Sequence, residues 1–81
     1  MNYNDDGYRM LAAAIVEQAV ADYRKALRRL RKHPEDDSAR YRKEECERFF
    51  RERMNRYVDA DLDGEAVIRA IRDRVDKETR R

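Results

Sequence analysis

Three aspartates and a glycine stand at the spacing that opens a calcium-binding loop. Asp59, Asp61 and Asp63 alternate with other residues and Gly64 follows, which gives the D-x-D-x-D-G start of an EF-hand. The twelfth position of such a loop requires a bidentate glutamate, but here it holds Ala70. An apolar helical pattern also begins inside the loop. We therefore expect a capped turn between two helices, with Asp63 as the N-cap, and no metal site.

The sequence holds one histidine and one cysteine, so few nucleophile or metal-ligand sets can be built. His33 alone supplies neither a catalytic triad nor a multi-histidine metal site, and we expect a helix-end cation beside Pro34. Cys46 falls on the apolar line of a predicted helix, where it would be a small buried side chain. We find no glycine-rich phosphate loop. The sequence thus predicts no enzyme, no catalytic residue and no cofactor.

A run of basic residues between Arg24 and Lys32 is the strongest local charge feature. It could contact phosphates or an acidic protein surface. Alternatively, it is a solvated helix end that lies near the acids at residues 35–37. As candidate partner-binding residues we select the cations and one tyrosine that the predicted helices leave off the core: Arg24, Arg28, Arg31, Lys32, Tyr41 and Arg48.

The basic run ends a long helix that we predict over residues 8–32, which contain no glycine or proline. Alanines recur there every seven residues, and larger apolar residues recur with the same period four positions on. The two rows are Ala12, Ala19 and Ala26, and Val16, Tyr23 and Leu30. Small residues along one edge let a partner helix approach closely, and Phe49 and Phe50 are suited to fill the space. We expect the basic side chains to lie on the opposite, solvent-facing side.

A second helix is predicted over residues 37–57, after the break at His33-Pro34 and a set of capping acids. Its core line is Ala39, Cys46, Phe50 and Tyr57, with Phe49 and Met54 on the flanks. We expect three ion pairs four residues apart: Glu44–Arg48, Glu47–Arg51 and Glu52–Arg56. A short connection of this kind makes the first two helices antiparallel neighbours.

A third helix is predicted over residues 64–77, with Val67, Ile68, Ile71 and Val75 on its buried face. The fold class that follows is all-α, and residues 1–81 form one domain. We expect a three-helix bundle with a long first helix, an antiparallel second helix and a shorter third helix. A core of this size gains from further burial, so a homodimer through leftover apolar surface is a further expectation.

Exposed aromatic residues are the second candidate surface. Tyr41 points away from the predicted core line, and either Phe49 or Met54 remains on a flank. Together they could form an apolar patch for a partner. The alternatives are that they complete the core or form a homodimer seam.

Composition limits the class of protein. Charged residues make up 47% of the 81 residues and hydrophobic residues 41%, which is too apolar and too periodic for a disordered chain. The net charge is only +2, whereas a dedicated nucleic-acid binder usually shows a larger basic excess. No apolar run approaches the roughly 20 residues that span a bilayer. We also expect that the first residues are not a signal peptide, and we therefore expect no membrane association. The single cysteine favours an intracellular location.

Three segments of the sequence resemble a family of small helical proteins that phages and integrative elements of Gram-positive gut bacteria encode. They are IVEQAVADYRKALRRLRKHPEDD, ERFF and DLDGEAVIRAIR, within residues 11–72. After Phe50 the chain reads RERMNRYVDA, where the family carries a small residue, a large aromatic and a more apolar stretch. The resemblance implies a binder in the cytoplasm of a bacterial host. Small proteins of mobile elements include anti-CRISPR inhibitors, which block a host nuclease.

The function that we expect is non-enzymatic binding to a protein partner, with a host nuclease complex as the partner that the resemblance implies. Two alternatives stay open at this point. One is a small nucleic-acid-binding protein that uses the basic end of the first helix, with an affinity that falls steeply as salt rises. The other is a structural or assembly protein whose partner is a second copy of itself.

Overall fold

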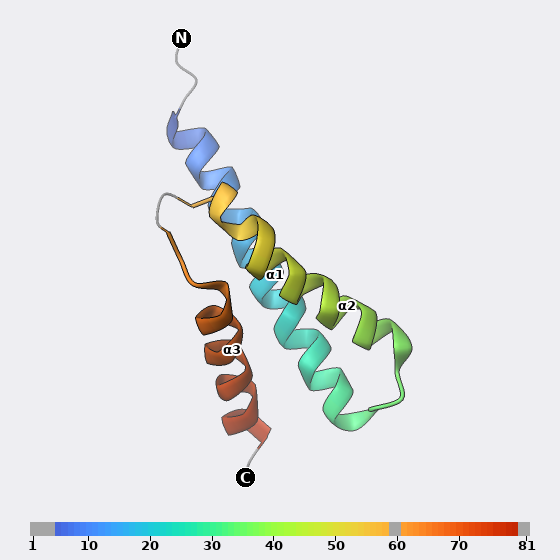
Figure 1. The fold of residues 1–81 in the computed structure, drawn as a ribbon. Coiled ribbons are helices and arrows are strands. Elements are labelled where there is room, and N and C mark those ends of the chain that lie inside the picture. The colour runs from blue at the N-terminus through green and yellow to red at the C-terminus, as the bar shows by residue number, and fades with distance from the viewer. Residues whose placement is uncertain (1–4, 59–60, 80–81) are drawn as a thin grey trace.

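The structure, a computed structural model, describes residues 5–58 and 61–79, and every regular element within them is a helix. The three main helices are α1 (Asp5–Lys32), α2 (Asp37–Arg48) and α3 (Gly64–Thr79). Two short segments continue α2: the π-helical η1 (Phe49–Arg53) and the 3₁₀-helical η2 (Met54–Arg56). The α2–η1–η2 run returns along α1, and α3 packs against α1 and η1 (Figure 1). The predicted all-α three-helix bundle is confirmed.

The helix ends differ from those predicted at several places. The first helix begins at Asp5, ahead of the expected residue 8, and residues 1–4 lie outside the described part of the chain. The third helix continues past residue 77 to Thr79. The second helix was expected to be regular over residues 37–57, but its α-helical winding ends at Arg48.

The π-helical segment η1 is the main departure from the expected regular helix. The backbone N–H of Met54 donates to the carbonyl of Phe49, five residues back instead of four. This wider turn lies where the first residue of α3 touches the backbone of η1. The apolar pattern of the sequence indicates which side of this helix is buried. The same pattern is compatible with α-helical and with π-helical winding, so it does not predict η1.

The helix α1 determines the length of the molecule, which measures 50 × 22 × 21 Å. Its 28 residues span about 40 Å at the usual rise of about 1.5 Å per residue. Figure 1 shows the blue start of α1 reaching beyond the yellow end of the α2–η1–η2 run. In the described parts of the chain, no helix is both long and apolar enough to cross a membrane.

The core lies where the three helices meet, near the middle of α1. Its largest fully buried side chains are Tyr23, Phe50, Met54 and Val75. The rings of Tyr23 and Phe50 make an edge contact with centroids 5.7 Å apart, so Phe50 fills the seam as expected. The other buried apolar side chains of the described residues are Leu27 and five that the apolar pattern predicted: Ala12, Ala26, Ala39, Cys46 and Ile68.

The connection from α1 to α2 is closed by one of the predicted acids. Asp36 is the N-cap of α2, and its carboxylate accepts from the N–H of Ala39 at 3.0 Å. The same carboxylate accepts from the guanidinium of Arg29 at 2.7 Å. The hydrogen bond from Arg29, followed by that from Ala39, lowers the pKa of Asp36 below its ordinary value.

The start of α3 is held against the end of the α2–η1–η2 run. The side chain of Asn55 both accepts from and donates to the backbone of Leu62, each at 2.9 Å. Asp63 then caps α3 as predicted, since its carboxylate accepts from the N–H of Glu65 at 3.0 Å. A side chain at Gly64 would collide with the carbonyl oxygen of Phe50, so only glycine fits this contact.

Candidate functional site

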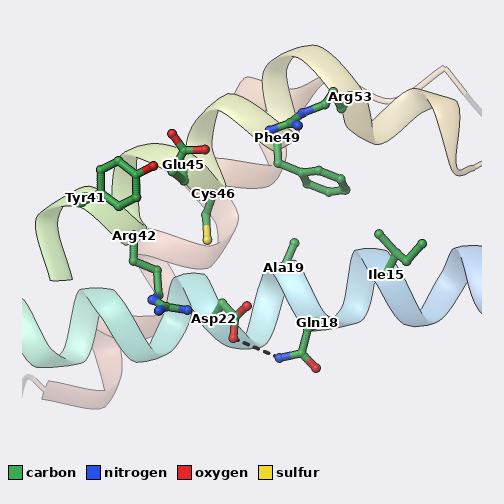
Figure 2. A pocket seen from close by; sticks show the side chains of 10 residues that line it. All are labelled: Ile15, Gln18, Ala19, Asp22, Tyr41, Arg42, Glu45, Cys46, Phe49 and Arg53. Carbon is green, nitrogen blue, oxygen red and sulfur yellow. Dashed lines mark hydrogen bonds between the residues drawn. The ribbon is translucent and has the colours of Figure 1, made fainter. Parts of the chain in front are cut away.

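A groove with a volume of about 520 Å³ runs between α1 and the α2–η1 run. Figure 2 shows it from close by, with α1 along one side, α2 and η1 along the other, and the side chains of Arg42, Cys46 and Phe49 pointing toward α1. The lining residues are Ile15, Gln18, Ala19, Asp22, Tyr41, Arg42, Glu45, Cys46, Phe49 and Arg53. The groove therefore combines an apolar interior with four charged side chains.

The floor of the groove is made of small side chains. Ala19 of α1 is half-buried, Cys46 of α2 is buried, and the sulfur of Cys46 points toward α1 (Figure 2). Larger apolar groups from Ile15, Phe49 and Tyr41 stand around this floor. Since small residues leave space between two helices, the floor can receive a large aliphatic side chain from outside.

The aromatic patch expected from the sequence lies in this groove. Met54 is buried in the core, whereas Phe49 is half-buried and lines the groove with Tyr41. The ring of Phe49 also stacks on Tyr57, with centroids 5.8 Å apart. Tyr41 is 66% exposed, which makes it the most accessible aromatic side chain among those that line the groove.

The rim of the groove carries two acids and two bases, so its formal charge is zero. The carboxylate of Asp22 accepts from the amide of Gln18 at 3.0 Å, drawn as a dashed line in Figure 2. The carboxylate of Glu45 accepts from Arg48 at 2.9 Å. Of the residues selected from the sequence, Tyr41 thus lines the groove directly and Arg48 holds a rim acid. The expected Glu44–Arg48 pair is replaced by this contact.

Cys46 has the environment of a structural thiol. It is buried as predicted, and burial raises the pKa of its thiol above the ordinary value. The protonated form therefore dominates at neutral pH, and the thiol is a weak nucleophile. Its contribution to the groove is shape.

An exposed apolar stretch continues from the groove along the start of α1. Met10 is 73% exposed and Leu11 is 61% exposed, and Ala13 and Ala14 beside them are exposed as well. Residues 10–16 contain no charged residue. We call the exposed residues of this stretch, Met10, Leu11, Ala13 and Ala14, the α1 arm; Ala12 between them is buried. Two large aliphatic side chains on such an arm indicate an interaction surface.

Three of the selected basic residues, Arg24, Arg28 and Arg31, pair with acids of α3, although Arg28 and Arg31 also remain exposed to solvent. The guanidinium of Arg28 donates twice to the carboxylate of Glu78, at 3.0 and 3.1 Å, and Arg24 lies 3.5 Å from it. Arg31 pairs with Asp76. The sequence placed these cations on a solvent-facing side, but that side of α1 is where α3 packs. Two carboxylates, of Glu78 and Asp76, thus offset most of the charge of these three cations.

The other basic residues of the run lie on a different side of α1. Lys25, Arg29 and Lys32 are spaced four and three residues apart, which places them on one helix face. Arg29 pairs with Asp36, and Lys32 is exposed. A hollow of about 220 Å³ is lined by Lys25, Arg29, Asp36 and Arg42 together with three small residues. These charged side chains sum to +2.

A buried polar cluster that the sequence did not predict ties the three helices together. The hydroxyl of Tyr23 donates to the carboxylate of Glu47 at 2.7 Å. The guanidinium of Arg72 donates to the Tyr23 hydroxyl at 3.0 Å and to Glu47 at 2.8 Å, and Lys43 lies 3.3 Å from Glu47. Tyr23 is 0% exposed and Glu47 is 6% exposed.

The cluster has the electrostatics of a structural contact. Burial and the hydrogen bond to Glu47 raise the pKa of the Tyr23 hydroxyl. For Glu47, burial alone would raise the pKa of the carboxyl, but the hydrogen bond from Tyr23 and the charges of Lys43 and Arg72 lower it. At neutral pH the tyrosine stays protonated and the glutamate ionised, so neither group is set to transfer a proton.

The predicted Glu47–Arg51 pair is wrong, because Glu47 turns inward and Arg51 pairs with Glu65 of α3. Charge-pair spacing along one helix led to that prediction. A better signal was Tyr23 on the seam, since a buried tyrosine hydroxyl requires a hydrogen-bond partner.

The described end of the D-x-D-x-D-G segment, residues 61–64, leads into α3, with Asp63 as the cap of that helix. Within residues 5–58 and 61–79, no group of three or more potential metal ligands is gathered in one place. Asp59 lies outside this described part.

In comparisons with protein-family models, curated proteins and solved structures, the chain has no match.

Proposed function

We propose that this chain is a non-enzymatic protein-binding module whose groove between α1 and the α2–η1 run takes an apolar helix of another protein chain. The observation that carries the proposal is the groove itself, which has a floor of small residues and an accessible tyrosine at its edge. Apolar helix faces bind in such grooves through side chains spaced three and four residues apart. Tyrosine is also enriched among the residues that dominate binding energy at interfaces.

The charges of the molecule support the groove over the basic run as the binding surface. Arg24, Arg28 and Arg31 already pair with acids of α3, whereas the groove is open and its rim is neutral. Because the rim carries both signs of charge and is neutral overall, it can accept either acidic or basic residues beside the apolar face of the partner helix. Given the resemblance to proteins of mobile elements, a host nuclease complex is the first heterologous partner to test.

The proposal is tested with Tyr41, which can be changed without touching the core. A fluorescent helical peptide with leucines three and four residues apart is titrated with the wild-type protein, Tyr41→Glu and the matched control Tyr41→Phe. We expect Tyr41→Glu to weaken binding about tenfold or more and Tyr41→Phe to retain it. Equal binding by all three proteins, or binding by none of them at concentrations where the chain is monomeric, would overturn the groove as the site.

Nucleic-acid binding is a second candidate, favoured by the hollow with a +2 sum of charges beside Lys25, Arg29 and Arg42. It predicts a mobility shift with duplex DNA at low salt that disappears as salt rises. Lys25→Glu combined with Lys32→Glu should remove the shift, while Arg24→Glu on the α3 side should leave most of it. No shift in about 50 mM salt argues against this candidate.

A further inference from the structure

We infer that the helix that fills the groove is α1 of a second copy of this chain. The two α1 helices would run antiparallel, and Leu11 of each copy would lie over Ala19 and Cys46 of the other. The inference rests on the proposed function, because it names the partner of the same groove. It makes the assembly an isologous dimer in which each copy both gives and receives the apolar side chain.

The first argument is that the α1 arm exposes a large apolar side chain, while the groove has open space for one. Leu11 on the arm is 61% exposed, and the start of α1 reaches beyond the end of the α2–η1–η2 run (Figure 1). The groove has open space, because the small side chains of Ala19 and Cys46 help to leave a volume of about 520 Å³. A second copy covers the arm and fills the groove in one contact. A core of this size gains stability from such burial.

The second argument is that the arm and the groove share one side of α1. Leu11, Ile15, Gln18 and Asp22 are spaced four, three and four residues apart, which places them on one helix face. The last three line the groove. Two such faces can meet as a helix pair. If Leu11 of one copy lies over Ala19 of the other, the two-fold axis passes beside Ile15, midway between them.

The third argument concerns charge. Residues 10–16 are uncharged, so pairing the two helices around Ile15 buries no charge from this stretch. Along α1 the acids Asp5 and Asp6 come first and the basic run from Arg24 to Lys32 comes last. Antiparallel packing brings the acidic start of one helix toward the basic half of the other. Parallel packing would place like charges beside each other, so the charge order favours the antiparallel arrangement.

The oligomeric state of the full chain tests the inference, by sedimentation equilibrium at chain concentrations up to about 1 mM. We expect a dimer for the wild type and a monomer for Leu11→Glu. Ala13→Glu is the matched control, because Ala13 is exposed on the same arm but lies on the opposite side of α1. It should remain dimeric. Circular dichroism verifies that both variants keep the wild-type helicity.

The register is tested by cross-linking. In a Cys46→Ala background, Ile15→Cys should form an intermolecular disulfide under mild oxidation, and Ala13→Cys should not. Cross-linking of Ala13→Cys in preference to Ile15→Cys would overturn the arrangement, as would a Leu11→Glu protein that stays dimeric.

The peptide titration described above separates this inference from the proposed function. A wild-type protein that is monomeric at about 1 mM and binds the helical peptide through Tyr41 overturns the dimer and keeps the groove as a site for another protein. A monomer that binds no such peptide overturns both.

Discussion

At the scale of single residues, Glu47 is the point on which the three helices converge. Its carboxylate accepts from Tyr23 of α1 and Arg72 of α3 and lies near Lys43 of its own helix. Buried polar groups of this kind are expensive to leave unpaired, so the cluster requires one relative placement of the three helices. Apolar contacts alone would tolerate small shifts of α3 along α1.

Removal of Glu47 should therefore destabilise the fold. Glu47→Ala leaves the Tyr23 hydroxyl and one side of Arg72 without their acceptor, and we expect a loss of about 2–4 kcal/mol in the free energy of unfolding. Urea unfolding followed by circular dichroism measures it. The control is Glu44→Ala, an exposed residue of the same helix, which should change the free energy by less than about 0.5 kcal/mol. Equal losses for the two variants would contradict the structural role of the cluster.

At the scale of elements, the contact between α3 and η1 depends on the absence of a side chain at Gly64. A methyl group there meets the Phe50 carbonyl, which belongs to the backbone and cannot turn away. We expect Gly64→Ala to cost about 1–3 kcal/mol through overpacking, although alanine is the better helix former. Thermal unfolding measures the change. Gly7→Ala, within α1, is the control and should be neutral or stabilising.

The division of the basic run between two sides of α1 also has a measurable consequence. Reversing Arg24, Arg28 and Arg31 to glutamate would place like charges against Glu78 and Asp76. Hydrogen exchange should then accelerate in the last turns of α3. Lys25→Glu with Lys32→Glu is the control on the other side of α1, and it should leave the protection of α3 unchanged. Unchanged exchange in the triple variant would show that these pairs do not hold α3.

The sequence was sufficient for patterns that repeat along one helix, and insufficient for contacts between helices. The apolar period predicted three helices, the seam on α1 and the burial of Phe50, because each depends on local spacing. The Tyr23–Glu47–Arg72 cluster, the pairing of Arg28 with Glu78 and the approach of Gly64 to η1 join residues far apart in the chain. Their partners are decided by how the helices pack.

At the scale of the whole molecule, three carboxylates that join elements have their pKa values lowered. The hydrogen bond from Arg29 lowers the pKa of Asp36, and the hydrogen bond from Arg28 lowers that of Glu78. For Glu47, burial raises the pKa, but the hydrogen bond from Tyr23 and the nearby cations lower it further than burial raises it. A lowered pKa in the folded state means that the unfolded chain takes up protons first as pH falls. The stabilisation is complete above the ordinary carboxyl pKa values, about 4, and declines below them.

We expect the urea midpoint to be nearly constant between pH 6 and pH 7, and to fall as the pH drops from about 5 toward 2. Glu47→Gln combined with Glu78→Gln should flatten this decline, because two of the linked protonations are removed. Measurement at a series of pH values gives the slope for each protein. An equally steep decline in the double variant would assign the acid sensitivity to other groups.

The contact between Gly64 and η1 also bears on the order in which the chain folds. The helices α1 and α2 are joined by a short turn, so their hairpin closes a small loop and can form early. The first residue of α3 touches the carbonyl of Phe50, within the π-wound turn. That surface exists only after η1 has adopted its winding. We therefore expect α3 to dock last, with the wide turn of η1 as the template on which the chain completes its fold.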